Sequence, residues 1–202
     1  MSAPAPEQAL DTLVETLRKD DSVISPHVHD AQDSPALGLL AAAGPRTAAT
    51  GSDYALLVES IREGYLLHYG RPRVVDASDR DLALLAGDYL YARGLERLAA
   101  LRDLEAVREL SDLISLAAQV HAGGNGAGSE PLWLATVVAV AAGGGERHAG
   151  AKAALREERP GAARELLDSA HSAATSAGIV GALTAAADSV GLALPADPSG
   201  IG

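Results

Sequence analysis

Two histidines and an aspartate lie close together in His27-Val28-His29-Asp30, within an irregular stretch near the N-terminus. Imidazole nitrogens and carboxylate oxygens are common ligands of zinc and other divalent metals. A His-x-His pair in a loop, without a further ligand at a recognisable spacing, is weak evidence for such a site. We therefore predict no metal at these residues.

Two arginines flank a proline in Arg71-Pro72-Arg73. Guanidinium groups pair well with phosphate oxygens, so Arg71 and Arg73 are candidates for binding a phosphate or diphosphate. The alternative, which we favour, is that both are solvated cations of a loop. The glycine-rich residues 122–128 lack the preceding strand and the final Lys-Ser/Thr of a phosphate-binding loop, and we interpret them as a hinge or linker.

Composition excludes several other chemistries and partners. The chain has no cysteine, which excludes disulfides and thiolate metal sites, and its six histidines stand in unrelated local contexts that predict no Ser/His/Asp triad. Its 16 basic residues are scattered among 27 acidic ones, for a net charge of −11. A nucleic-acid-binding surface needs clustered Lys and Arg. We therefore predict no nucleic-acid partner and no attachment to an anionic membrane.

The elements that must position these residues are predicted to be helices. Apolar residues make up 48 % of the 202 residues, with no Phe, one Trp and many Ala and Leu. Ala and Leu favour helices, whereas the β-branched and aromatic residues that favour strands are few. Periodicity and breakers predict helices over residues 8–19, 36–43, 52–69, 79–101, 103–121, 129–142, 146–158, 160–177 and 179–191.

Local signals mark the ends and the burial of some of these helices. Ser52 and Asp53 are expected to cap one helix, and Ser78 another, because short polar side chains accept hydrogen bonds from the first-turn amides. The helix that begins at residue 129 is apolar nearly all round, which indicates a buried helix with Trp133 in the core. We expect a disordered leader over residues 1–7, one helical domain over 8–194 and a flexible tail over 195–202.

The chain is expected to be cytoplasmic, without stable membrane insertion. Its N-terminus carries Pro and Glu rather than the basic and then apolar pattern of a secretory signal. Its most apolar stretch, residues 131–142, is too short to span a bilayer.

Two phrases in the middle of the chain carry a family resemblance. They read His68-Tyr69-Gly70-Arg71-Pro72-Arg73 and Leu84-Leu85-Ala86-Gly87-Asp88-Tyr89-Leu90-Tyr91-Ala92-Arg93-Gly94. Together they resemble the trans-type polyprenyl diphosphate synthases, in which an Arg-Arg-Gly-x-Pro turn precedes a helix reading roughly Leu-Ala-Gly-Asp-Tyr-Leu-Leu-Ala-Arg-Ala. The match covers about 50 of the 202 residues. The resemblance implies an all-α helical bundle, an abbreviated isoprenoid synthase-type fold.

The resemblance also implies where a metal would bind. In that family, two Asp-Asp-x-x-Asp clusters hold Mg²⁺ ions that neutralise the substrate's leaving diphosphate. Counting back from Gly70 places the first cluster at residues 59–63, where Glu59 and Glu63 share one helical face. The resemblance makes Glu59 and Glu63 the remnant of a Mg²⁺ site. We favour an exposed helix face on which they pair with Arg62 or solvent, and expect no cofactor unless residual activity requires Mg²⁺.

The other diphosphate-binding parts of the family pattern are missing. The place of the family's basic Gly-Gly-Lys-Arg-x-Arg-Pro motif reads His29-Asp30-Ala31-Gln32-Asp33-Ser34, which is acidic. His68 and Tyr69 stand where the paired arginines are expected, and no second Asp-Asp-x-x-Asp cluster follows Trp133.

What the chain retains are the helices that form the dimer interface in the resembled family. Candidate core or interface residues are Leu84, Leu85, Tyr89, Leu90, Leu113 and Ile114. We expect Asp88, which follows a glycine in mid-helix, to have a structural role within the packed bundle rather than to contact a ligand.

These observations favour a non-catalytic or regulatory polyprenyl diphosphate synthase-like subunit in isoprenoid biosynthesis. It would act by helix-mediated dimerisation, as a homodimer or as a heterodimer with a catalytic prenyl synthase. Two alternatives stay open: an active prenyltransferase with altered motifs, and a generic helical interaction module.

Overall fold

The computed structural model describes residues 4–124 and 126–195 of the chain. Every α or β element in these residues is a helix, which confirms the all-α prediction, and an isolated bridge between Val28 and Val75 is the nearest approach to a strand. The helices are α1 (Ala9–Lys19), α2 (Ala36–Ala43), α3 (Gly51–Tyr69), α4 (Arg80–Ala100), α5 (Leu104–Ala122), α6 (Ser129–Ala142), α7 (Gly145–Arg156), α8 (Ala162–Ala177) and α9 (Val180–Ser189).

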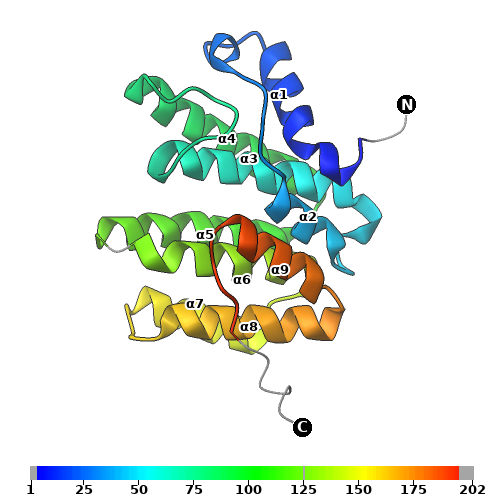
Figure 1. The fold of residues 1–202 in the computed structure, drawn as a ribbon, viewed down its shortest axis with the longest axis vertical. Coiled ribbons are helices and arrows are strands. Elements are labelled where there is room, and N and C mark those ends of the chain that lie inside the picture. The colour runs from blue at the N-terminus through cyan, green and yellow to red at the C-terminus, as the bar shows by residue number, and fades with distance from the viewer. Residues whose placement is uncertain (1–3, 125, 196–202) are drawn as a thin grey trace.

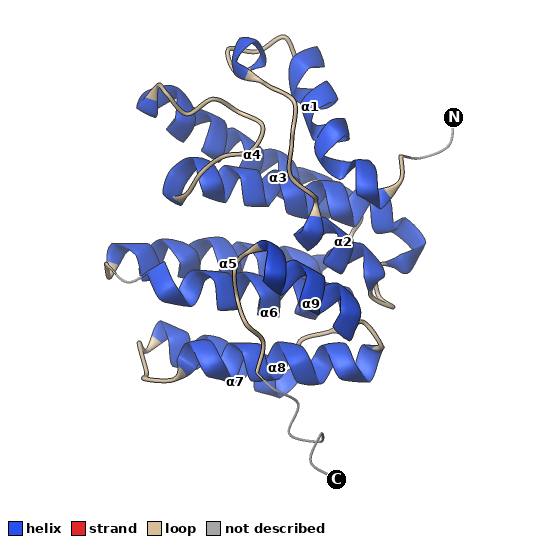
Figure 2. Cartoon of the chain, viewed as in Figure 1, coloured by secondary structure: helices blue, strands red, loops and turns tan. Residues whose placement is uncertain are grey.

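The helices are stacked in tiers (Figures 1 and 2). The upper tier holds α1, α3 and α4, the middle tier α5, α6 and α9, and the lower tier α7 and α8. The short helix α2 joins the tiers, because it packs on α3 above and on α6 and α9 below. The Ala- and Leu-rich composition suits this arrangement, since small side chains let helices approach closely.

The core is divided into two hydrophobic clusters that meet at α3. The larger one fills the space between the upper and lower tiers and includes Leu57 and Ile61 of α3 together with Trp133, as predicted. The smaller one lies between α1, α3 and α4 and includes Leu56 and Leu67 of α3. Because opposite faces of α3 serve different clusters, this helix is buried on nearly all sides.

Helix α4 approaches α3 closely at glycines. A Cβ atom built on Gly87 would lie 2.6 Å from Nε2 of His68, and one built on Gly64 would lie 2.9 Å from the Gly87 carbonyl oxygen. This approach explains the glycine before Asp88, because no larger residue fits there. The Asp88 side chain is 77 % exposed and pairs with His68 Nε2 at 3.2 Å.

Two of the predicted caps are wrong. The N-cap of α4 is Asp79, whose side chain accepts hydrogen bonds from the amides of Asp81 and Leu82. Ser78 instead donates its hydroxyl to Asp76 at 2.8 Å. Helix α3 begins at Gly51 after Thr50, which places Ser52 and Asp53 inside its first turn rather than at the cap position.

The ends of the chain are only partly described. Of the expected leader, residues 1–3 lie outside the described residues, but Pro6–Gln8 form a 3-10 helix that runs directly into α1. Helical structure therefore begins before residue 8. Of the expected tail, residues 196–202 lie outside the described residues. Within the described ranges, no helix combines the length and the apolar character required to cross a bilayer.

Candidate functional site

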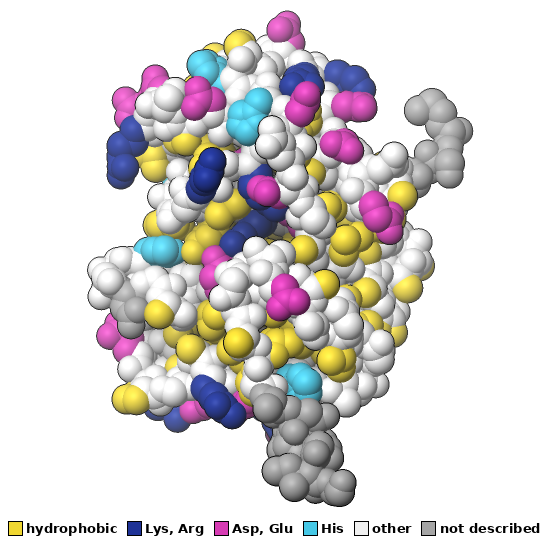
Figure 3. All heavy atoms as spheres, viewed as in Figure 1, with side chains coloured by type: hydrophobic (Ala, Val, Ile, Leu, Met, Phe, Trp, Pro, Cys, Tyr) yellow, Lys and Arg dark blue, Asp and Glu magenta, His cyan; other side chains and the backbone are white. Residues whose placement is uncertain are grey.

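A cleft lined by three arginines lies beside the middle of α3. Its walls come from the residues before α2, from α3, from the loop after α3 and from the end of α9, and it encloses about 390 Å³. The lining residues are Asp33, Ser34, Ala36, Leu37, Arg62, Leu66, Arg71, Arg73, Ser189 and Val190. Figure 3 shows Lys and Arg side chains gathered in a hollow between the upper and middle tiers, next to hydrophobic surface.

Glu59 sits beneath this cleft and stabilises two segments at once. Its Oε1 accepts a hydrogen bond of 2.6 Å from the amide of Gly38, in the first turn of α2. First-turn amides lack partners within their own helix and attract negative charge. Its Oε2 lies 2.7 Å from Nη1 of Arg73. The Glu59 carboxylate therefore fixes both α2 and the loop after α3.

The side chain of Glu63 binds the backbone amides of the same loop. Its Oε1 accepts hydrogen bonds from the amides of Arg73 and Val74 at 2.8 Å and from that of Val75 at 3.3 Å. Its Oε2 accepts from Nε of Arg73 at 3.3 Å. A buried carboxylate requires this kind of compensation by donors and an opposite charge.

The expectation that Glu59 and Glu63 occupy an exposed face and pair with Arg62 is wrong. Both glutamates have 0 % exposure, and their cationic partner is Arg73. Arg62 donates instead to Oε1 of Glu130 on α6, at 2.8 Å. The reason is the double burial of α3, which turns the two glutamates toward α2 and the following loop, and Arg62 toward α6.

These carboxylates do not fit the Mg²⁺ site that the resemblance implies. Mg²⁺ needs oxygen ligands in a near-octahedral shell, and the oxygens of Glu59 and Glu63 already face Arg73 and backbone amides. In the part of the chain that the structure describes, no three His, Cys, Asp or Glu side chains gather in a metal-binding group. Asp30, which follows the His27-x-His29 pair in the sequence, forms an ion pair of 2.9 Å with Arg18.

The two candidate phosphate-binding arginines differ sharply. Arg71 is exposed, as expected of a loop cation. Arg73 is not solvated: its side chain is only 14 % exposed. Burial disfavours its charged form, but the adjacent Glu59 and Glu63 outweigh this effect and raise the pKa of Arg73. The interpretation as a solvated cation is therefore wrong for Arg73, because the buried carboxylates of Glu59 and Glu63 lie beneath the loop and pair with it.

Arg62 is held rigidly in the wall of the cleft. Its guanidinium lies 4.9 Å from the ring centroid of Tyr65 and 5.0 Å from that of Trp133, in addition to its ion pair with Glu130. Cation–π contacts of a desolvated arginine contribute about 2 kcal/mol. The side chain of Arg62 is 8 % exposed.

An aromatic cluster adjoins Arg62, at the C-terminal half of α3. Tyr65 lies 2.9 Å from Nε2 of His121, and Tyr69 stacks on the same imidazole at 4.2 Å between centroids. His68 stacks on Tyr91. Burial lowers the pKa of His121, which favours its neutral form. The sequence signal for this cluster was the spacing of Tyr65 and Tyr69 on one face of α3, but His121 and Tyr91 come from other helices.

The candidate interface residues divide into core and surface. Leu90 and Leu113 are buried in the two core clusters, whereas Leu84 and Leu85 of α4 are 37 % and 54 % exposed. Ile114 is half-buried. Leu104 at the start of α5, which helical spacing predicts to face inward, is instead 65 % exposed, so that prediction is wrong.

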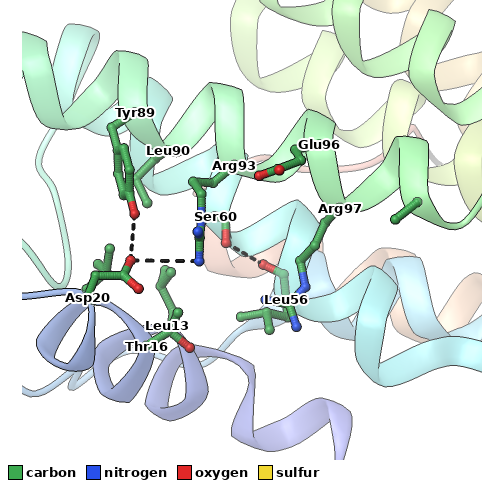
Figure 4. Close-up of a pocket in the computed structure, with 12 residues that line it drawn as sticks. Leu13, Thr16, Asp20, Leu56, Ser60, Tyr89, Leu90, Arg93, Glu96 and Arg97 are labelled. Atoms are coloured by element: carbon green, nitrogen blue, oxygen red, sulfur yellow. Dashed lines mark hydrogen bonds and ion pairs between the residues drawn. The ribbon is translucent and has the colours of Figure 1, made fainter.

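A separate groove of about 260 Å³ runs between α1 and α4. Its apolar lining includes Leu13, Leu56 and Leu90, and Figure 4 shows Tyr89 and Arg93 pointing to Asp20 across it. Tyr89 donates its hydroxyl to Asp20 Oδ2 at 2.6 Å, so this interface candidate ties α4 to the end of α1. Sequence reasoning did not identify this groove.

Comparison of the chain with protein-family models, with curated proteins and with solved structures finds no match. The likeness to polyprenyl diphosphate synthases therefore remains a prediction that rests on the sequence phrases around Gly70 and Gly87.

Proposed function

We propose that the chain is a non-catalytic, polyprenyl diphosphate synthase-like subunit of the cytoplasm that acts by association through α4 and α5. One observation carries this proposal. The two acids aligned by resemblance with the family's first metal-binding cluster, Glu59 and Glu63, are buried and bound to Arg73. They stabilise the fold, and a metal would have to displace a buried ion pair.

The exposed face of α4 supports the association part of the proposal. Leu84, Leu85 and Ala92 are exposed and lie at helical spacing around the exposed, charged Asp88. Apolar side chains grouped on one face of a helix are typical of contact surfaces. We propose that this face of α4 contacts either a second copy of the chain or a full-length prenyl synthase.

The enzymatic part is tested by a product assay. The purified chain is incubated with isopentenyl diphosphate, an allylic diphosphate and Mg²⁺, and we expect no elongated product. Turnover by the chain alone that is lost in Glu59→Gln and Glu63→Gln variants shown to be folded would refute the proposal and favour an active prenyltransferase.

The association part is tested with a matched pair of variants. Leu85→Glu places a charge on the α4 face, whereas Val23→Glu places one at a surface valine that is 66 % exposed. We expect Leu85→Glu alone to reduce the mass measured by light scattering, or to abolish co-purification of a prenyl synthase from the native host. A monomeric wild-type chain that recovers no prenyl synthase would favour the generic interaction module.

A further inference from the structure

We propose that the groove between α1 and α4 binds a small monocarboxylic acid with an apolar body, whose carboxylate is held by Arg93 and Arg97. The site lies apart from the buried glutamates of α3 and from the exposed Leu84 and Leu85 of α4, so it does not rest on the proposed function.

The groove arises from the way in which three helices pack. Helices α1 and α4 both pack on α3 but scarcely on each other, which leaves a space of about 260 Å³ between them. Tyr89 spans it by donating its hydroxyl to Asp20 at 2.6 Å, and the lining continues along α4 to Ala100. Pockets for drug-sized ligands measure about 300–1,000 Å³, so this groove suits a smaller molecule.

The floor of the groove is apolar. It is formed by leucines of the smaller core cluster, namely Leu13, Leu17, Leu56 and Leu90. Thr16 and Ser60 also line it, but their hydroxyls donate to carbonyls of their own helices at 2.7 and 2.8 Å. A ligand with an apolar body would rest on these leucines and on the aliphatic stems of the arginines, away from water.

Two accessible arginines reach over this floor from successive turns of α4. Figure 4 shows the side chains of Arg93 and Arg97 extending from α4 into the groove, toward Ser60 and Leu56 of α3. Arg97 is exposed, and its side chain has no hydrogen bond or ion pair within the described residues. Arg93 is 41 % exposed and reaches Asp20 only at 3.7 Å, which is longer than a hydrogen bond. Both guanidinium groups therefore keep donors for a ligand.

The acids of the groove leave these donors available but limit the charge of the ligand. Asp20 already accepts the Tyr89 hydroxyl, and Glu96 stays at the level of α4 in Figure 4, away from the floor. Guanidinium forks match the two oxygens of a carboxylate, whereas a polyanion would be repelled by Asp20 and Glu96. Charge and floor together favour one carboxylate on an apolar body.

Calorimetric titration of the full chain with octanoate at pH 7 tests the site. Acetate supplies the carboxylate without the body, and octanamide supplies the body without the charge. Arg97→Ala removes an exposed cation, and Ala100→Phe fills the groove from an exposed position and leaves both arginines in place. Arg164→Ala, at an arginine of α8 whose side chain is 70 % exposed, is the control.

We expect octanoate to bind and both acetate and octanamide to bind more weakly. Arg97→Ala and Ala100→Phe should each weaken octanoate binding roughly tenfold, equivalent to about 1.4 kcal/mol, while Arg164→Ala binds as wild type. Absence of octanoate binding, equal binding of octanamide, undiminished binding by Arg97→Ala or by Ala100→Phe, or an equal loss in Arg164→Ala would each overturn the proposal.

Discussion

Glu63 fixes the loop after α3, because its buried carboxylate accepts hydrogen bonds from three consecutive amides and an arginine. The segment that it holds, residues 73–75, also supplies Val74 and Val75 to the smaller core cluster. Losing the carboxylate would therefore remove a partner of the Arg73 charge and loosen the packing of Val74 and Val75 in the smaller core cluster.

Replacing Glu63 by Gln should destabilise the chain by about 3 kcal/mol, because it breaks a buried ion pair and leaves Arg73 with Glu59 as its one remaining buried carboxylate partner. Urea denaturation followed by circular dichroism measures the change in unfolding free energy. Glu146→Gln, at an exposed glutamate of α7, is the control and should change stability by less than about 0.5 kcal/mol. Equal midpoints for the two variants would contradict the role assigned to Glu63.

At this scale, sequence reasoning singled out Glu59 and Glu63 but predicted the wrong partner and the wrong exposure for them. The helical spacing of Glu59 and Glu63 is visible in the sequence, as is Arg62 between them. The true partner, Arg73, lies ten residues beyond Glu63 across a loop. No periodicity reports a contact of that kind, since it depends on how the chain turns back after α3.

Among the elements, α3 and α4 are fitted to each other by small residues. Gly94 of α4 lies against Ile61 of α3, and a Cβ atom there would overlap that side chain. Gly150 of α7 and Gly181 of α9 have open space around them. The three glycines therefore allow a comparison of packing with intrinsic helix propensity.

Gly94→Ala should destabilise the chain by about 1–3 kcal/mol, because an overpacked contact forces α3 and α4 apart. Gly150→Ala should stabilise it by roughly 0.5–1 kcal/mol, because alanine favours the helix and meets no neighbour. Thermal unfolding followed by circular dichroism measures both. A stabilising Gly94→Ala would show that the α3–α4 contact is looser than described.

Helix positions were largely predictable, because breakers such as Gly44-Pro45 and Gly70 are local signals. Caps were less so: Asp79, rather than Ser78, accepts from the first-turn amides of α4. Both residues are good caps, and the choice depends on the direction in which the preceding loop enters. The packing partner of each helix, and so the arginine-lined cleft, was not predictable from a single amphipathic pattern.

For the whole molecule, stability in acid should depend on the contact between α5 and α7. Glu109 accepts hydrogen bonds from His148 at 2.9 Å and from Lys152 at 2.8 Å. Burial would raise the pKa of Glu109, but these two donors and their charges outweigh it and lower the pKa. A lowered pKa stabilises the folded state above the ordinary value of 4.5, and this contribution disappears as the pH falls through the folded-state value.

Glu109→Gln should therefore lower stability at pH 7 and flatten the loss of stability between about pH 5 and pH 3. Denaturant midpoints across that range measure the slope. The control is Glu15→Gln, whose surface pair with Lys19 is largely exposed and should contribute about 0–1 kcal/mol. A slope in Glu109→Gln as steep as that of the wild type would contradict the prediction.

The all-α class followed from composition, but the division of the core into two clusters did not. Leu56 and Leu57 are adjacent in sequence and belong to different clusters. An apolar run on α3 predicts that the helix is buried, but it does not indicate how many other elements pack against it. The same ambiguity led to the wrong exposed face for Glu59 and Glu63.

Trp133 gives the molecule a built-in optical probe. It is the single tryptophan of 202 residues, is 1 % exposed, and has the Arg62 guanidinium over its ring at 5.0 Å. A change in the position or charge environment of Arg62 alters the electric field at the indole, and with it the emission wavelength. Events in the cleft can therefore be followed by intrinsic fluorescence, without a label and without interference from a second indole.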